Sequence, residues 1–194
     1  MKQRDLLNTW LRALGKRPGL PVIGDYRPDR IDDELVDMMQ YDVHGEGEQA
    51  RFLITHEGAR LATTYGSEDV EPAKRTNRYL DDALGPERYA NVVSLYRACL
   101  AHRRPAYSIA TVLDADGKEV SYERLLLPFG SAGAVAQVVG SFKSISIEGG
   151  FKIANLMGLR PKAVPVILVR AIIDLDFVPR VADHHASDDV IELS

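Results

Sequence analysis

Hydrophobic and polar residues alternate most clearly between residues 105 and 129, where two runs rich in β-branched and aromatic residues flank a short polar segment. The segment Asp114-Ala115-Asp116-Gly117 places a glycine where a type I turn followed by a bulge requires a positive φ. The pattern therefore predicts that strands 105–113 and 119–128 pair as an antiparallel hairpin. Neither face of the first strand is frankly polar, so we expect both faces to be covered.

An amphipathic helix is expected directly before this hairpin, over residues 86–101. Gly85-Pro86 places a proline at the first helical position, which favours a helix start. Pro105 ends the helix, and the basic segment 102–104 suits the negative end of its dipole. One face is expected to be buried, because apolar residues recur at helical spacing, at Tyr89, Val92, Val93, Tyr96, Cys99 and Leu100.

A second amphipathic pattern lies near the start of the chain. Leu7, Trp10, Leu11 and Leu14 belong to an apolar stripe on a predicted leading helix that ends near Gly15. A stripe of this kind outside the domain core covers either a sheet face or a second subunit.

Shorter patterns predict the remaining elements. They are a short helix from Asp29 through Met39, a turn at 45–48, strands at 51–55 and 60–64 joined by a turn at 56–58, a helical region over about 68–84, a strand within 133–147, a tail helix over 151–158, and one or two strands within 164–177. Up to residue 147 the order is strand, strand, helices, strand, strand, strand. This order predicts an α+β protein with one five-stranded antiparallel sheet.

Short sequence elements follow one another in an extended pattern over about three-quarters of the chain. They are Trp10-Leu11, Leu20-Pro21, Asp25, Pro28, Ile31, Glu34-Leu35, Arg51-Phe52, Gly58, Leu61, Tyr65-Gly66, Tyr79-Leu80, Tyr96, Arg104-Pro105, Asp116-Gly117 and the run from Tyr122 to Pro128. In this order and spacing the chain resembles a PAS domain, specifically the alphaproteobacterial type of PAS family that is usually found as small stand-alone proteins.

The resemblance implies a fold and a signalling role. It implies a PAS-like sheet over residues 41–147, with N-terminal flanking helices over 1–40 and a C-terminal extension over 148–194. It transfers no active site, because PAS families have no invariant catalytic residues. Flanking helices of PAS proteins often build a dimer, so we expect a homodimer with an interface at Leu7, Trp10, Leu11 and Leu14.

Composition agrees with one globular unit. The 194 residues are 45% hydrophobic and 27% charged, with a formal net charge of -4 at pH 7. No basic stripe is present to follow a phosphate backbone, so nucleic-acid binding is not expected. The longest apolar stretch, 163–175, is interrupted by charged residues and is too short for a membrane span. A single cysteine and a polar start predict a cytoplasmic protein.

Sequence motifs for common enzyme chemistry are missing. The chain has no glycine-rich phosphate loop, no paired cysteine motif for zinc and no nucleophile elbow, so we expect neither catalytic residues nor a metal site. We interpret His184-His185, which lie among aspartates, as part of a solvated tail. His102 lies where some PAS proteins carry a haem-ligating histidine, but an interaction at the helix C-terminus beside two arginines is favoured. The identity of any cofactor stays open.

A small ligand, if one binds, is expected between helix 86–101 and the sheet, touching Tyr96, Tyr107, Ile109 and Glu123. These positions combine aromatic area with the few polar groups that can orient a guest. The alternatives are plain core packing for the tyrosines and a structural ion pair for Glu123. Cys99 faces the same core, where a lone buried thiol is typically inert and redox sensing is the alternative.

Three functions remain open at this point. The resemblance favours a non-enzymatic sensory and signalling module that binds a protein partner, with or without a small ligand. Because the chain carries no kinase, cyclase, phosphodiesterase or DNA-binding domain of its own, this function requires a separate signalling protein such as a histidine kinase. The second function is a small-molecule enzyme, an isomerase or dehydratase, on a cone-like α+β fold. The third is a structural adaptor with a filled core.

Overall fold

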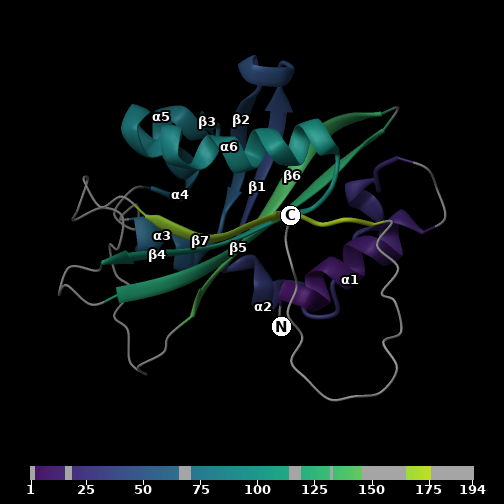
Figure 1. The fold of residues 1–194 in the computed structure, drawn as a ribbon, viewed down its shortest axis with the longest axis horizontal. Helices are drawn as coiled ribbons and strands as arrows, with labels where there is room; N and C mark the ends of the chain where they lie inside the picture. The colour runs from purple at the N-terminus through teal and green to yellow at the C-terminus, as the bar shows by residue number, and fades with distance from the viewer. Residues whose placement is uncertain are drawn as a thin grey trace.

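The computed structural model describes residues 3–15, 19–65, 71–113, 119–131, 133–145 and 165–175. Over these residues the protein is an α+β fold built on one open antiparallel sheet (Figure 1). Its strands are β1 (Met38–His44), β2 (Arg51–Glu57), β3 (Arg78–Tyr79), β4 (Ala106–Leu113), β5 (Glu119–Ser131), β6 (Ala134–Ile145) and β7 (Val166–Ile172). They lie side by side in the order β3-β2-β1-β6-β5-β4-β7.

The α+β class and the antiparallel sheet agree with the sequence, but the described sheet has seven strands and not five. The two additional strands lie at its two ends. β3 is only two residues long and pairs with β2 through Leu53 and Ile54. β7 pairs with β4 and comes from the segment assigned to the C-terminal extension, so this extension adds a strand to the sheet.

The predicted hairpin and the helix before it are both confirmed. β4 and β5 pair in antiparallel register from Ala106 with Leu126 to Leu113 with Glu119. The turn at 114–118 lies outside the described residues. Helix α6 (Pro86–His102) begins at the expected proline and ends where Arg103 adopts a positive φ of 54°.

Helices cover both faces of the sheet (Figure 1). They are α1 (Gln3–Leu14), α2 (Ile31–Leu35), α3 (Ala59–Tyr65), α4 (Pro72–Arg75), α5 (Leu80–Leu84) and α6, with short 3₁₀ turns η1 (Ile23–Asp25) and η2 (Gly47–Gln49). The α6 side chains pack in one core cluster with Leu126, whereas α1 packs in a second cluster with Leu125 and Leu127. Because neighbouring residues of a strand point to opposite faces, α6 and α1 lie on opposite sides of β5.

The predicted stripe on α1 packs within its own chain. Trp10 is fully buried, and its indole Nε1 donates a hydrogen bond to the Pro128 carbonyl oxygen at 2.8 Å. Leu7 and Leu14 are partly buried against the same cluster, while Leu11 keeps 37% of its surface exposed. The helix therefore covers a sheet face, one of the two outcomes expected for such a stripe.

The segment 36–65 differs from the sequence prediction. The short helix stops at Leu35, β1 begins at Met38, and the expected strand at 60–64 is the helix α3. The chain turns at Gly58, whose N–H donates to the Met38 carbonyl at 2.9 Å and where an added Cβ would clash with the Leu35 and Val36 carbonyl oxygens. The first strand therefore begins before residue 41, whereas the turn at 45–48 and the strand expected at 51–55, which is β2, lie where they were predicted.

A buried ion-pair network joins α2, α3 and β6. Lys143 Nζ lies 2.7 Å from Glu34 Oε2 and 3.7 Å from Asp37 Oδ2, and Arg60 Nη1 lies 2.6 Å from the same Asp37 oxygen. Burial raises the pKa of Asp37, although Arg60 and Lys143 oppose the rise. For Glu34, burial also favours the protonated form, but the hydrogen bond and charge of Lys143 help to hold its pKa below the ordinary value.

The residues that follow β7 are bound to the residues that precede β4. Arg104 Nη1 lies 2.6 Å from Asp174 Oδ1, and the Ile173 N–H donates to the Pro105 carbonyl at 2.8 Å. A strand within 164–177 is thus confirmed, whereas the expected helix 151–158 and the pair His184-His185 lie outside the described residues. No helix in the described ranges combines the length and hydrophobicity needed to cross a membrane.

Candidate functional site

The four residues expected to touch a ligand do not face one cavity. Tyr96 packs in the cluster beneath α6, whereas Tyr107 packs in the cluster beneath α1, on the other side of the sheet. Ile109 shares a face of β4 with Tyr107 and is paired directly with Glu123 of β5. Tyr107, Ile109 and Glu123 therefore lie together on the α1 side of the sheet, away from Tyr96.

Glu123 and Tyr107 interact with each other across the hairpin. Burial, followed by the charge of Glu123 and a hydrogen bond to it, raises the pKa of Tyr107 to about 12. The phenol is therefore a neutral donor to the carboxylate at physiological pH. A tyrosine thus satisfies Glu123, for which the sequence favoured an ion pair.

Tyr96 is part of the core beneath α6. Its hydroxyl lies 2.9 Å from the Tyr41 hydroxyl, and its ring makes edge contacts with Tyr41 and Phe52 at centroid distances of 5.4 and 5.0 Å. Burial raises the pKa of Tyr96, although Arg124 and the hydrogen bond from Tyr41 oppose the rise. Packing of this kind agrees with the alternative interpretation of Tyr96 as a core residue.

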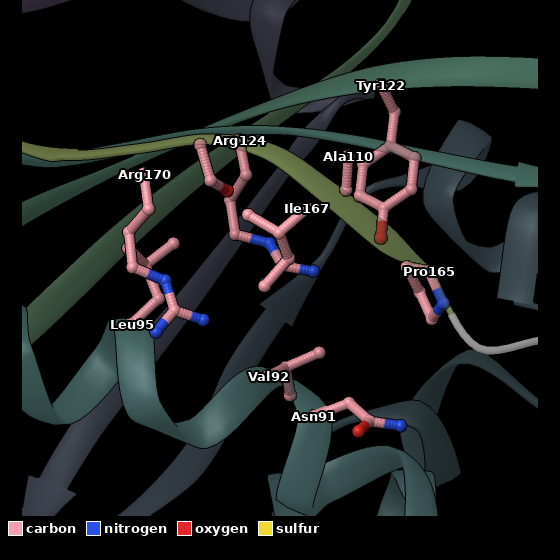
Figure 2. Close-up of a pocket in the computed structure, with 10 residues that line it drawn as sticks. Asn91, Val92, Leu95, Ala110, Tyr122, Arg124, Pro165, Ile167 and Arg170 are labelled. Atoms are coloured by element: carbon pink, nitrogen blue, oxygen red, sulfur yellow. The ribbon is translucent and has the colours of Figure 1, made fainter.

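A small cavity lies between α6 and the sheet, where strands β5, β4 and β7 run next to one another (Figure 2). Its volume is about 20 Å³, which is room for about one water molecule. It is lined by Asn91, Val92 and Leu95 of α6, Ser108 and Ala110 of β4, Tyr122 and Arg124 of β5, and Pro165, Ile167 and Arg170 at β7. The cavity occupies the region expected for a ligand, but different residues form it.

Strand register places two arginines in one row across the sheet. Ser108 of β4 is paired with Arg124 on one side and with Arg170 on the other. The next row toward the hairpin turn is Tyr122, Ala110 and Ile167. Figure 2 shows the side chains of both arginines and Tyr122 projecting from the strands toward α6.

A β-bulge makes this arrangement possible. Ile109 is paired with Val169 and Ala110 with Ile167, so Leu168 is an extra residue in β7. In a regular strand Ile167 and Arg170, three positions apart, would point to opposite faces. The bulge turns both side chains toward α6.

Arg124 is 6% exposed and is held among aromatic rings. Its guanidinium carbon lies 5.3 Å from the centre of the Phe142 ring and 5.9 Å from those of Tyr96 and Tyr122, within the range of cation–π attraction. Burial raises the pKa of Tyr122, and the Arg124 charge opposes the rise only in part. The Tyr122 hydroxyl is therefore a neutral hydrogen-bond donor beside this cation.

Other chemistry-bearing residues lie away from this cavity. His102 is exposed at the end of α6 and does not line the cavity. Cys99 is fully buried, its Sγ lies 4.0 Å from the Leu126 carbonyl oxygen, and burial raises its pKa, which keeps the thiol protonated and unreactive. The described ranges contain no group of three His, Cys, Asp or Glu residues arranged to hold a metal ion.

Comparisons with protein-family models, with curated proteins and with solved structures gave no match to this chain.

Proposed function

We propose that this protein is a non-enzymatic sensory module of PAS type that passes a change in the cavity beneath α6 to a protein partner. The order of elements supports the fold on which this proposal rests. β1 and β2 precede the helices α3 to α6, and β4, β5 and β6 follow them. The five longer strands that precede β7 lie side by side as β2-β1-β6-β5-β4, and the helix before β4 covers the cavity.

One observation carries the proposal: β7 is both a wall of the cavity and the outer strand of the sheet. Ile167 and Arg170 line the cavity. Leu168, which lies between them, and Val166, which precedes Ile167, are 59% and 63% exposed. A guest that shifts the β7 backbone at Ile167 or Arg170 also shifts this apolar edge, because the residues belong to one short strand. Cavity and edge are therefore coupled through a single element.

We take the partner at this edge to be a second copy of the chain. β7 is the last strand in the order, and among the described residues no strand pairs with its outer side. Its only charged residue is Arg170. An antiparallel two-fold pairing centred on Val169 sets Arg170 opposite Leu168 of the second copy, so the pairing brings no two like charges together. An unprotected edge rich in apolar residues favours such pairing.

Sedimentation velocity of three proteins tests this partner. We expect the wild type to be a dimer and Leu168→Lys to be a monomer with an unchanged circular dichroism spectrum, because a lysine on an edge strand opposes pairing. Leu11→Lys is the matched control, an exposed leucine on α1, and should remain a dimer. A monomeric wild type, or a dimer that only Leu11→Lys dissociates, would contradict the β7 interface.

Native mass spectrometry and an absorption spectrum of the purified protein test the sensory part. A co-purified small molecule, or a change in amide exchange of β7 and α6 when a ligand is added, is the expected result. The small cavity favours one competing function, a structural adaptor with a filled core. That function gains support if no molecule is bound on purification and no added carboxylate alters the amide hydrogen exchange of β7.

A further inference from the structure

We propose that the cavity beneath α6 binds a short organic carboxylate, held between Arg124 and Arg170 across Ser108. This inference rests on the proposed sensory function and assigns a chemical class to its ligand. It concerns residues that the sequence pattern did not single out as ligand contacts.

The spacing of the row fits a carboxylate between two guanidinium groups. Arg124 and Arg170 are separated by one strand, so their Cα atoms lie about 10 Å apart, twice the distance between neighbouring strands. Ser108, between them, has a small side chain that leaves space above β4. Both arginine side chains extend from their strands toward α6 (Figure 2). A planar carboxylate there can accept hydrogen bonds from both arginines.

The charges around the cavity favour an anion. Two of its ten lining residues are arginines and none is acidic. The remaining polar groups are the Asn91 amide and the Ser108 and Tyr122 hydroxyls, each able to donate a hydrogen bond. An anion bound between Arg124 and Arg170 is attracted by both positive charges.

The apolar part of the lining distinguishes a carboxylic acid from an inorganic anion. Five of the ten lining residues are apolar, namely Val92, Leu95, Ala110, Pro165 and Ile167. They provide contacts for an aliphatic chain and none for a second charged group. The cavity of about 20 Å³ has room for about one water molecule, so a carboxylic acid enters only when the exposed Arg170 side chain moves outward. This limited space favours a short chain.

Isothermal titration calorimetry and thermal unfolding with a defined set of compounds test this assignment. Propionate and butyrate represent the expected class, propionamide is the neutral counterpart, and inorganic phosphate tests a small anion without an apolar part. We expect both carboxylates to bind and raise Tm, with butyrate no weaker than propionate. Propionamide and phosphate should have little effect.

Two variants test the residues. Arg170→Gln, at an exposed position, should fold normally and weaken carboxylate binding by roughly tenfold or more, because a charge-assisted hydrogen bond is lost. Arg4→Gln, an exposed residue on α1, removes the same charge from the opposite side of the sheet and should bind as the wild type does. Arg124→Lys keeps the charge of the buried site but removes the planar fork, so it should also weaken binding.

Some outcomes would overturn this proposal and leave the sensory function standing. The carboxylate assignment fails if neither acid binds, if propionamide or phosphate binds as well as the acids, or if Arg170→Gln and Arg4→Gln behave alike. A neutral molecule found bound to the purified protein would also exclude it, while it would support a sensor. Failure of the β7 edge to associate, by contrast, would leave the carboxylate measurement untouched.

Discussion

Lys143 lies close to the buried carboxylate of Glu34 and near that of Asp37, which Arg60 also pairs. The Glu34 side chain is only 2% exposed and lies 2.7 Å from Lys143 Nζ, and Asp37 is nearly as buried. An ionised carboxylate at such depth is tolerated only with compensating charge and hydrogen bonds. The network therefore contributes little net stability as a whole, but the loss of Lys143 weakens the compensation of the buried Glu34 charge.

We predict that Lys143→Gln lowers the free energy of unfolding by about 2–3 kcal/mol at neutral pH, because Glu34 loses its close cation. The effect should depend on pH. In the wild type the pKa of Glu34 is below its ordinary value of 4.5, so its contribution is present above that pH and is lost as the pH falls through the folded pKa. In the variant, Lys143 no longer lowers the pKa of Glu34, so this pKa is higher than in the wild type and protonation on acidification relieves the penalty.

Urea unfolding at about pH 7 and about pH 3.5 measures this dependence. The deficit of Lys143→Gln relative to the wild type should shrink at the lower pH. Lys74→Gln is the matched control, since Lys74 forms an exposed pair with Glu71 and its loss should change stability by less than about 0.5 kcal/mol. A deficit of equal size at both pH values would mean that Lys143 matters through the packing of its aliphatic chain.

Helix α1 is fixed to the sheet by one residue that combines packing with a hydrogen bond. Trp10 fills the space against Tyr26 and Phe129 and donates to the Pro128 carbonyl. We predict that Trp10→Phe lowers the free energy of unfolding by about 2–3 kcal/mol, because it leaves a cavity and a buried acceptor without its donor. Thermal unfolding measures the change.

Leu11→Ala is the control for this helix. Leu11 is the exposed member of the stripe, so its truncation should cost less than about 1 kcal/mol. If both variants lose the same stability, α1 is not held through Trp10. Because Trp10 is buried, a charged residue at this position would disrupt the fold. The dimer is therefore tested at exposed positions.

Elements with local signals could be predicted from the sequence. Pro86 starts α6, and the polar segment before Glu119 separates β4 from β5. β1 and α3 lacked such signals. β1 is buried on both faces, with Met38 in one core cluster and Met39 in the other, so no alternation identifies it as a strand. α3 follows a sharp turn at Gly58 that is determined by the Leu35 and Val36 carbonyls, distant contacts that a local pattern does not contain.

The cavity lies between helix 86–101 and the sheet, but its lining contains none of the four residues that the sequence predicted as ligand contacts. Alternation along strand 105–113 places Tyr107 and Ile109 on one face, but it does not determine which face of a hairpin turns toward the preceding helix. The structure turns the other face, with Ser108 and Arg124, toward α6. Arg170 joins them only through the bulge at Leu168. A bulge depends on strand pairing and leaves no clear signal in the sequence of a single strand.

The sheet joins two separate cores, and its last strand takes part in both. Ile172 packs against the cluster beneath α6, whereas Ile173 and Leu175 pack against the cluster beneath α1. β7 also pairs along β4 from Ala106 to Thr111. The segment assigned to a C-terminal extension therefore completes the main fold, although it follows β6 only after residues outside the described ranges.

We predict that a chain ending at Gly149 is less stable by about 3 kcal/mol or more, because it loses three apolar side chains from the two cores and exposes the pairing edge of β4. This corresponds to a fall in Tm of roughly 10 °C for a protein of this size. The matched control is a chain ending at Leu175, which keeps β7 and its contacts and should unfold within about 2 °C of the full-length protein. If the chain ending at Gly149 unfolds at the temperature of this control, β7 is an attached strand on a sheet that is complete without it. If it unfolds earlier, as we expect, the outer wall of the cavity is part of the cooperative fold, and a guest that binds there stabilises the whole molecule.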